Sequence, residues 1–261
     1  MSDYQFECVD NPRSLLDLRN LYLNGLPHSQ DYFVELQVKQ ARWYLIKSGS
    51  TRTGYFILSN DGCLLEYFML PEWANQEDVL LGNLIEKYSI RKALCKSYDA
   101  FLLSSCYQYQ KKSRAIGILF PEIQSPRQAV SQFPFSIRHA VPADEPMIVS
   151  INENVFDSAK EVMEYIESSQ IFLYEKENDL IGFGIYSQII EGRPARDIGM
   201  LVVPAFRNKG YGCAILQHLI QYCRQNQWPP QAGCDIENTA SRHCLEKAGF
   251  IPRYRLLEFT F

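Results

Sequence analysis

The six residues Arg207 to Gly212, RNKGYG, have the types and spacing of a phosphate-binding turn. An apolar run at 200–203 stops at Pro204, and beyond the turn apolar residues recur at helical spacing. A strand that turns through glycines into a helix directs several backbone N–H groups at one point, where the helix dipole adds partial positive charge. Gly210 and Gly212 place no Cβ atoms there, while Arg207 and Lys209 add positive charge. The segment therefore predicts a site for a pyrophosphate.

Two other glycine-rich motifs, the P-loop and the dinucleotide fingerprint, do not fit this turn. A P-loop requires Gly, four residues and then Gly-Lys-Ser/Thr, and that order is absent. A dinucleotide fingerprint requires a third small residue near Ile215 and an acidic residue about twenty positions later, and neither is present. A plain strand–turn–helix with a glycine-rich corner stays open on the evidence of the turn alone.

A second segment, 238–250, reads as a helix with a defined entry and exit. Asn238 and Ser241 stand at the entry, and Gly249-Phe250 follows the last helical residues. Taken with the glycine turn, this segment resembles the GNAT superfamily of acetyl-CoA-dependent N-acetyltransferases. The first family signature is matched by Arg207, Gly210 and Gly212 after the Val-x-Pro-like strand end at Val203, and the second by Asn238, Ser241, Gly249 and Phe250.

Within the superfamily, two short runs are similar to bacterial enzymes of the zwittermicin-resistance type. These are the Asp-Ile-Gly beginning at Asp197 and the run AGCDIEN at 232–238. The resemblance implies an α/β (α+β) GNAT fold with a central mixed, mostly antiparallel sheet flanked by helices. It also implies acetyl-CoA as co-substrate, no metal, and a cofactor site made of Leu201, Val202, Val203, Arg207, Asn208, Lys209, Gly210, Tyr211, Gly212, Cys213, Asn238 and Ser241.

Acyl transfer from a thioester to an amine requires a proton acceptor, because an ammonium near its usual pKa is mostly protonated at neutral pH. The resemblance implies that free N–H groups of Leu201, Val202 and Val203 bind the pantetheine arm and the thioester oxygen. Asp197 stands six residues before Val203, where several GNAT enzymes carry an acidic base. A solvated charge paired with Arg193 or Arg196 is the alternative for Asp197.

The acid that protonates the leaving thiolate is less clearly indicated. Many GNAT enzymes carry a tyrosine seven residues after the motif asparagine, and here that position is Leu245, which has no proton to donate. Cys244, Tyr254 or a water molecule could replace it, or the thiolate could leave unassisted. His218 and His243 are interpreted as surface or packing residues on the two C-terminal helices.

The composition is that of a water-soluble globular protein, with 46% hydrophobic and 21% charged residues among 261. The net charge of −4 and the lack of a basic patch argue against nucleic acid as a partner. No apolar run reaches the length of a membrane span and no signal pattern is recognised, so a cytoplasmic location is expected. The eight cysteines contain no Cys-x-x-Cys pair and are expected to be reduced core residues.

The chain is expected to contain two domains of similar design. The proline-containing segment 121–134 reads as a linker, and 135–261 reads as a catalytic GNAT domain. Residues 1–120 repeat the same order of elements, with Leu70-Pro71 in the place of Val203-Pro204. Their phosphate turn is missing, since 74–78 end in two carboxylates that would repel a pyrophosphate. Residues 1–120 therefore resemble a degenerate GNAT lobe, with a family-specific α/β cap as the alternative.

These observations together predict an acetyl-CoA-dependent N-acetyltransferase that acts on a primary amine of a small molecule by direct transfer in a ternary complex. A CoA-binding regulatory or sensor protein with impaired catalysis, and a transferase of another acyl group, are the alternatives. No nucleic acid or membrane partner is expected. The sequence leaves a homodimer open and does not identify the acceptor.

Overall fold

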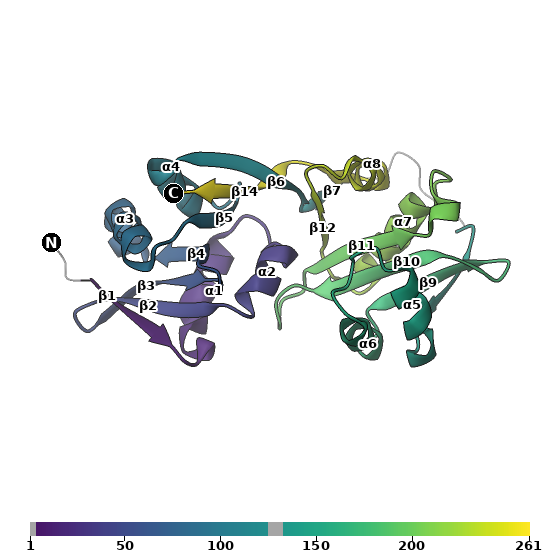
Figure 1. Ribbon diagram of the computed structural model, residues 1–261, viewed down its shortest axis with the longest axis horizontal. Helices are drawn as coiled ribbons and strands as arrows, with labels where there is room; N and C mark the ends of the chain where they lie inside the picture. Colours follow the sequence, from purple (N-terminus) through teal and green to yellow (C-terminus); the bar gives the residue numbers. More distant parts are fainter. Residues whose placement is uncertain (1–3, 125–132) are drawn as a thin grey trace. The chain divides into compact units, whose positions relative to one another are not determined.

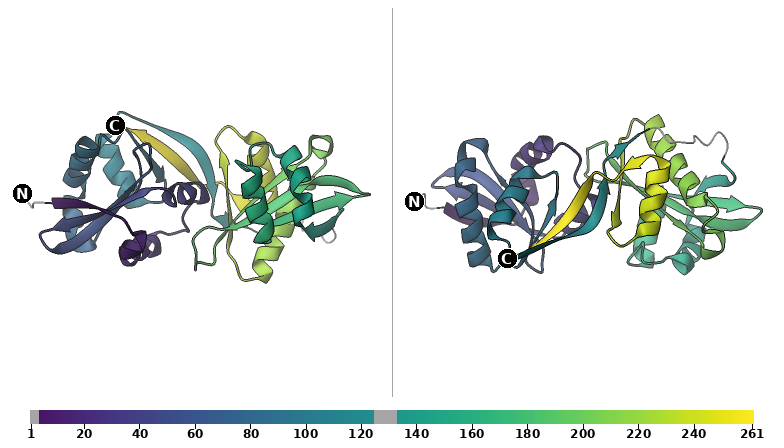
Figure 2. Two further views of the ribbon diagram at one scale, coloured as in Figure 1. Left: turned by 60° about the horizontal axis from the view of Figure 1, so that its bottom comes forward. Right: turned by 90° about the horizontal axis from the view of Figure 1, so that it is seen from above.

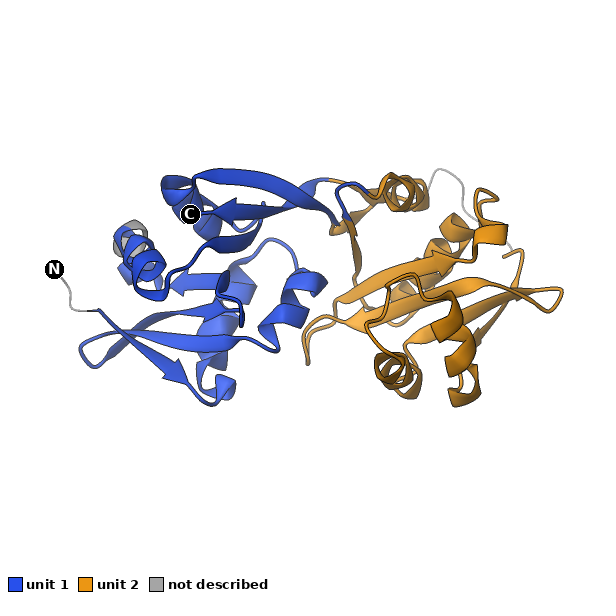
Figure 3. Ribbon diagram, viewed as in Figure 1, with its two compact units in different colours: residues 1–119, 235–237, 253–261 blue, residues 120–234, 238–252 orange. Residues whose placement is uncertain are grey.

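Each half of the chain builds a sheet covered by helices on both faces in the computed structural model (Figures 1 and 2). The structure describes residues 4–124 and 133–261. For residues 76–78 it describes the backbone only. Two compact units can be separated (Figure 3). Unit 1 consists of Met1–Leu119, Asp235–Glu237 and Arg253–Phe261, and unit 2 consists of Phe120–Cys234 and Asn238–Pro252.

Unit 1 contains seven strands among its described residues, in the order β1-β2-β3-β4-β5-β14-β6. Its strands are β1 (Tyr4–Val9), β2 (Arg42–Ser48), β3 (Thr51–Leu58), β4 (Cys63–Met69), β5 (Lys92–Lys96), β6 (Lys112–Phe120) and β14 (Tyr254–Thr260). Its helices are η1 (Pro12–Leu15), α1 (Leu16–Gly25), α2 (Tyr32–Val38), η2 (Pro71–Gln76), α3 (Glu77–Tyr88) and α4 (Ala100–Tyr109).

The last strand of the chain, β14, belongs to unit 1. It pairs antiparallel with β5 from Leu256↔Lys96 to Thr260↔Lys92, and on its other edge with β6. The sequence-based division placed all of 135–261 in one domain, whereas residues 235–237 and 253–261 belong to unit 1 in the structure. Strand pairing between segments so far apart in the chain has no local sequence signal, which explains the difference. The expected linker at 121–134 falls mostly on 125–132, outside the described residues.

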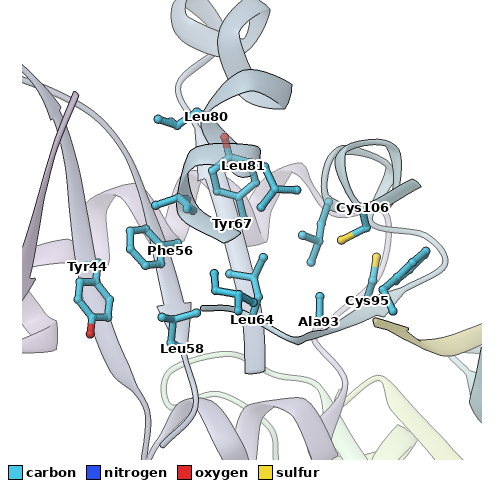
Figure 4. Packing of buried hydrophobic residues seen from close by; sticks show 14 of the residues in the cluster. Tyr44, Phe56, Leu58, Leu64, Tyr67, Leu80, Leu81, Ala93, Cys95 and Cys106 are labelled. Atoms are coloured by element: carbon cyan, nitrogen blue, oxygen red, sulfur yellow. The ribbon is translucent and has the colours of Figure 1, made fainter. Parts of the chain in front are cut away.

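One face of the unit 1 sheet carries its hydrophobic core. Alternate residues of β3 and β4 point to the same side, so Phe56, Leu58 and Leu64 meet the apolar faces of α3 and α4. Figure 4 shows these side chains beside Leu80 and Leu81. A fully buried core of this kind is the main source of stability for a unit of this size.

The opposite face of the same sheet carries a buried network of charges between the sheet and helices α1 and α2. Glu66 on β4 is fully buried and accepts hydrogen bonds from Arg19 (2.7 Å), Gln30 (2.7 Å) and Tyr55 (2.8 Å). Arg19 also pairs with Glu35. Burial alone would raise the pKa of Glu66, but the guanidinium of Arg19 and its hydrogen bonds bring that pKa below its ordinary value.

Unit 2 contains a five-stranded sheet in the order β12-β11-β10-β9-β8, together with a two-stranded pair of β13 and β7. Its strands are β7 (Glu122–Ile123), β8 (Ser136–His139), β9 (Ile171–Lys176), β10 (Asp179–Gln188), β11 (Arg196–Val202), β12 (Pro230–Asp235) and β13 (Phe250–Ile251). Its helices are η3 (Pro142–Asp144), α5 (Glu145–Ile151), α6 (Ala159–Glu167), η4 (Pro204–Phe206), α7 (Tyr211–Gln225) and α8 (Thr239–Ala248).

The two faces of the unit 2 sheet are covered by different helices. Phe183 and Leu201 point to the side of α5 and α6, where they pack with Ile148 and Val162. Gly184 lies on the other side, where an added Cβ would stand 3.0 Å from Leu219 of α7. The expected α/β fold with a mixed, mostly antiparallel sheet in each half is confirmed. Within the described residues, no helix has the length and apolar character needed to cross a membrane.

We predict that Arg19→Met destabilises unit 1 by about 3–5 kcal/mol, because it leaves the buried carboxylates of Glu66 and Glu35 without their cation. Urea denaturation followed by circular dichroism measures the change. Arg52→Met is the matched control, since the Arg52–Asp17 pair is largely exposed and its loss should cost less than about 1 kcal/mol. Equal stabilities for the two variants would contradict this account of the network.

Candidate functional site

Strands β11 and β12 separate from each other shortly after they begin. They run parallel and pair only at Arg196↔Pro230 and Asp197↔Gln231, although β11 continues to Val202. On its other edge β11 remains paired with β10 over all seven residues. The later part of β11 therefore presents backbone groups toward the opening between β11 and β12, where a ligand could pair with them.

The direction of each amide in β11 follows from one hydrogen bond at the strand end. The Val203 N–H donates to the carbonyl oxygen of Ile181 at 2.9 Å, so the expectation of a free Val203 amide was wrong. Backbone direction alternates along a strand, so Leu201 also faces β10, whereas Val202 faces the opening. The carbonyl oxygen of Val202 accepts a bond from Arg207 Nε, in agreement with this direction. Of the three amides expected at the thioester, Val202 is the one directed into the opening.

The glycine turn leads directly into α7, and its backbone explains its residue types. Gly210 is the N-cap of α7 with φ of +85°, and Asn208 has φ of +59°. Glycine and asparagine adopt this left-handed region at least cost. An added Cβ at Gly210 would meet no described atom within 4 Å, so the space in front of the turn is open. The first-turn amides of a helix have no partners within that helix and are directed at this point.

Gly212 is required for a close approach between α7 and α8. An added Cβ there would stand 3.0 Å from the Cys244 sulfur and 3.1 Å from the Met200 methyl group. The side chain of Cys213 is half-buried, and this burial raises the pKa of its thiol. The second glycine of the motif therefore has a packing role as well as its expected place in the cofactor site.

The charged and aromatic side chains of the turn are held by neighbouring groups. Arg207 bonds to Val202 and to Glu153, and Lys209 Nζ donates to the Ala205 carbonyl oxygen at 2.9 Å. The hydroxyl of Tyr211 accepts a bond from Lys176 at 3.5 Å. Arg207 and Lys209 are both exposed and lie in the turn that precedes α7.

Asn238 has the structural role that its position suggests. Its side-chain oxygen accepts the N–H of Ser241 at 2.9 Å and thereby caps α8, a contribution of about 1 kcal/mol for residues of this type. The helix ends at Gly249, whose φ is +108°. Cofactor contacts of Asn238 and Ser241 remain predictions.

Asp197 lies at the last paired position before β11 and β12 separate. Its direct partner across β10 is Ser187, so both side chains lie on the face covered by α5 and α6. The Ser187 hydroxyl is 3.3 Å from the hydroxyl of Tyr165 on α6, and the Tyr165 ring contacts Phe156. A carboxylate, two hydroxyl groups and an aromatic ring therefore share this face near the opening.

The candidates for the acid are distributed over both units. Leu245 is buried, and the sulfur of Cys244 lies against Gly212. Burial raises the pKa of the Cys244 thiol to about 12, so this thiol is protonated at neutral pH. Tyr254 belongs to unit 1, where its ring packs on His28 and Tyr98. Cys244 is thus the candidate donor that lies on the same unit as the turn.

Two histidines of unit 2 have the packing or surface positions expected for them. His218 Nδ1 is 2.9 Å from the Tyr174 hydroxyl, and burial, with a smaller effect of His139, lowers its pKa to about 4. His243 is exposed on α8. In the part of the chain that the structure describes, no three His, Cys, Asp or Glu side chains form a group suited to a metal ion.

Unit 1 contains a similar opening in its sheet with different contents. Strands β4 and β5 pair only at Cys63↔Lys92 and Leu64↔Ala93. Two residues beyond the last pair, β4 carries Glu66, whereas β11 carries Gly199 at the equivalent offset from Asp197. At the end of β5, the Lys96 ammonium donates to Gln30 at 2.7 Å and to Tyr22 at 2.8 Å. Buried side chains therefore occupy this region of unit 1.

One residue of the site could not be identified from the sequence. Glu153 lies between α5 and α6, 54 positions before its partner Arg207, and no motif relates the two residues. The polar character of its segment gave no indication beyond a surface turn. Only the folded arrangement brings its carboxylate to Arg207 of the glycine turn.

Comparison with family models gave two matches that together cover most of the chain. Residues 11–123 match a model described as "Acetyltransferase (GNAT) domain", and residues 141–250 match one described as "Acetyltransferase (GNAT) family". The comparison with curated proteins gave no match.

Solved structures show the same arrangement of strands and helices over almost the whole length. An acetyltransferase of the GNAT family from Colwellia psychrerythraea superposes with a TM-score of 0.89 at 16% identity, covering 98% of this chain and 99% of that one. A GCN5-related N-acetyltransferase from Sphaerobacter thermophilus gives 0.65 at 12% identity, covering 98% and 94%.

A tandem GNAT protein from the clavulanic acid biosynthesis pathway gives a TM-score of 0.58 at 13% identity, covering 99% of this chain and 98% of that one. At these identities the likeness concerns the fold. Both family matches describe GNAT domains, one in each half, and the full-length structural matches include a tandem protein. The chain therefore belongs to the GNAT acetyltransferase family and carries two GNAT domains in tandem.

Proposed function

We propose that unit 2 binds acetyl-CoA and transfers its acetyl group directly to a primary amine of a small molecule. The observation that carries this proposal is the separation of β11 from β12, on a strand that leads through the glycine turn into α7. An exposed strand edge suits the amide-rich pantetheine arm, and the start of α7 suits the pyrophosphate. The two short runs that are similar to zwittermicin-resistance enzymes are consistent with a small acceptor, and this proposal uses them for nothing more.

The residues present fit a CoA molecule at this place. The open space in front of Gly210 leaves room for phosphate oxygens, and Arg207 and Lys209 supply positive charge beside it. The Val202 N–H is directed into the opening, where it could bind the pantetheine arm or the thioester oxygen. Asn208, Tyr211 and Cys213 complete the proposed contact surface, with Asn238 and Ser241 at the start of α8.

Asp197 is the proposed proton acceptor for the amine. It lies where the two strands separate, on the face that also carries the hydroxyl groups of Ser187 and Tyr165. A carboxylate there attracts a protonated amine and takes up a proton as the new C–N bond forms. Burial raises the pKa of the Cys244 thiol and makes it a weak acid, so the departing thiolate is proposed to take the second proton of the amine, through water, as the C–S bond breaks.

A CoA-binding sensor with impaired catalysis is the second candidate function. Leu245 favours it, because a buried leucine occupies the position at which many family members carry a tyrosine acid. Following free CoA release from acetyl-CoA across a panel of primary amines distinguishes the two functions. Release that depends on one amine supports the transferase, while binding without release supports the sensor.

We predict that the chain binds one CoA and that Gly210→Asp weakens this binding at least tenfold, because the new side chain places a negative charge at the phosphate turn. Calorimetry gives both the stoichiometry and the dissociation constant. The matched control is Gly192→Asp, which has a similar φ of +78° and equally open surroundings in the turn after β10. Two CoA molecules per chain, or equal effects of the two substitutions, would count against the proposed site.

We predict that replacing both Asn238 and Ser241 by alanine weakens acetyl-CoA binding beyond the effect of the lost helix cap. The cap accounts for about 1 kcal/mol of stability. Ser158→Ala, which removes the cap of α6, is the control for stability alone. If both variants melt at lower temperature but bind acetyl-CoA equally well, Asn238 and Ser241 are caps only.

We predict that Asp197→Asn lowers turnover about 10²-fold or more, because the amide keeps the shape of the side chain but cannot accept the proton. Acetyl-CoA affinity should hardly change. In the parent protein the rate should fall as the carboxylate becomes protonated in acid, and the variant should lose this dependence.

A pH–rate series with the amine found active in the panel measures this effect. Asp179→Asn, at the exposed start of β10, is the control and should keep the parent profile. Near-parental turnover of Asp197→Asn at every pH would remove Asp197 from the mechanism.

A further inference from the structure

The guanidinium of Arg207 joins the end of β11 to the turn between α5 and α6. Its Nε donates to the Val202 carbonyl oxygen at 2.9 Å, and its Nη2 donates to Glu153 Oε2 at 2.5 Å. The first bond fixes the guanidinium beside the strand end that leads into the phosphate-binding turn. The Nη edge then carries the donors best placed for a phosphate, and Glu153 holds part of that edge.

The turn that carries Glu153 is ordered by its own hydrogen bonds. Asn152 Oδ1 accepts the N–H groups of Val155 (2.8 Å) and Phe156 (3.0 Å), and Asn152 Nδ2 donates to the Phe156 carbonyl oxygen at 2.7 Å. The ring of Phe156 is buried in the core beside Phe183. The carboxylate of Glu153 is therefore presented from a fixed backbone, which lowers the entropy cost of its pairing with Arg207.

We propose that Glu153 sets the affinity of unit 2 for its cofactor: its carboxylate occupies the Nη edge of Arg207 as an internal anion, which the pyrophosphate of CoA must displace. This inference rests on the proposed function, because it takes the turn at Arg207 to be the pyrophosphate site. It assigns a role to a residue outside both sequence motifs. Glu153 contacts Arg207 and is not a catalytic residue.

The size of the effect follows from the exposure of the pair. The side chain of Arg207 is 43% exposed and that of Glu153 is 51% exposed, so water and salt weaken their attraction. Removing the carboxylate frees the Nη edge and removes a negative charge near the incoming phosphates. Glu153→Gln should therefore bind CoA about two- to fivefold more tightly at low ionic strength, the range expected from loss of one surface ion pair. The gain should shrink as salt is added.

Calorimetric titration with CoA at low and high salt tests the inference. Glu164→Gln is the matched control: its carboxylate is an exposed partner of Lys160 on α6, and its loss should leave the dissociation constant unchanged. The gain from Glu153→Gln should be clearly smaller in an Arg207→Gln background, because the cation for which the two anions compete is then absent and only the loss of a nearby negative charge remains. Glu153→Ala repeats the comparison with a second side chain, and the melting temperature of each variant verifies its folding.

The results separate this inference from the function on which it rests. CoA binding by the wild-type chain without a gain in Glu153→Gln and Glu153→Ala would overturn the role of Glu153 and leave the proposed function intact. A gain of equal size in the Arg207→Gln background would also overturn it. Failure of the wild-type chain to bind CoA would overturn the proposed function, and this inference with it.

Discussion

The candidate site depends on the loss of pairing between β11 and β12 after only two residue pairs. Buried backbone amides must be hydrogen-bonded, so a strand that leaves its neighbour creates a demand for new partners along that edge. In unit 2 the opening starts at Asp197↔Gln231, and the glycine turn and the start of α7 follow at the end of β11. This irregularity of the sheet places the carboxylate of Asp197 at the beginning of an open strand edge. The strand then leads, through the glycine turn, to the start of α7.

The two units differ in the side chains that lie beside this opening. Unit 1 also separates its parallel strands after two pairs, but Glu66 and Lys96 from those strands form a buried network with Arg19, Gln30 and Tyr22. At the corresponding offset unit 2 has Gly199, which has no side chain to fill the space. A buried charge network of this kind is stable only when each partner is present, and in unit 1 it fills the region beside the opening with internal contacts. This difference supports the assignment of cofactor binding to unit 2.

The positive charges of the glycine turn are held by neighbouring groups of the protein. Arg207 is anchored at Nε by a backbone carbonyl and at Nη2 by Glu153, while Lys209 donates to the carbonyl of Ala205. Anchoring lowers the entropy cost of placing a long side chain at a ligand, but a partner carboxylate competes with the ligand for the same donors. The affinity of such a site reflects both effects.

Features that depend only on neighbouring residues could be predicted from the amino-acid sequence. The turn at Gly210 could be predicted because its glycines act locally, and the cap at Asn238 because it bonds only three residues ahead. Helical and strand periodicity likewise located most elements of both units. Tertiary structure decided the pairing of β14 with β5, the direction of the Val203 amide toward Ile181, and the contact of Glu153 with Arg207. These features join residues far apart in the chain, and their energies exist only once the sheet and its covering helices have formed.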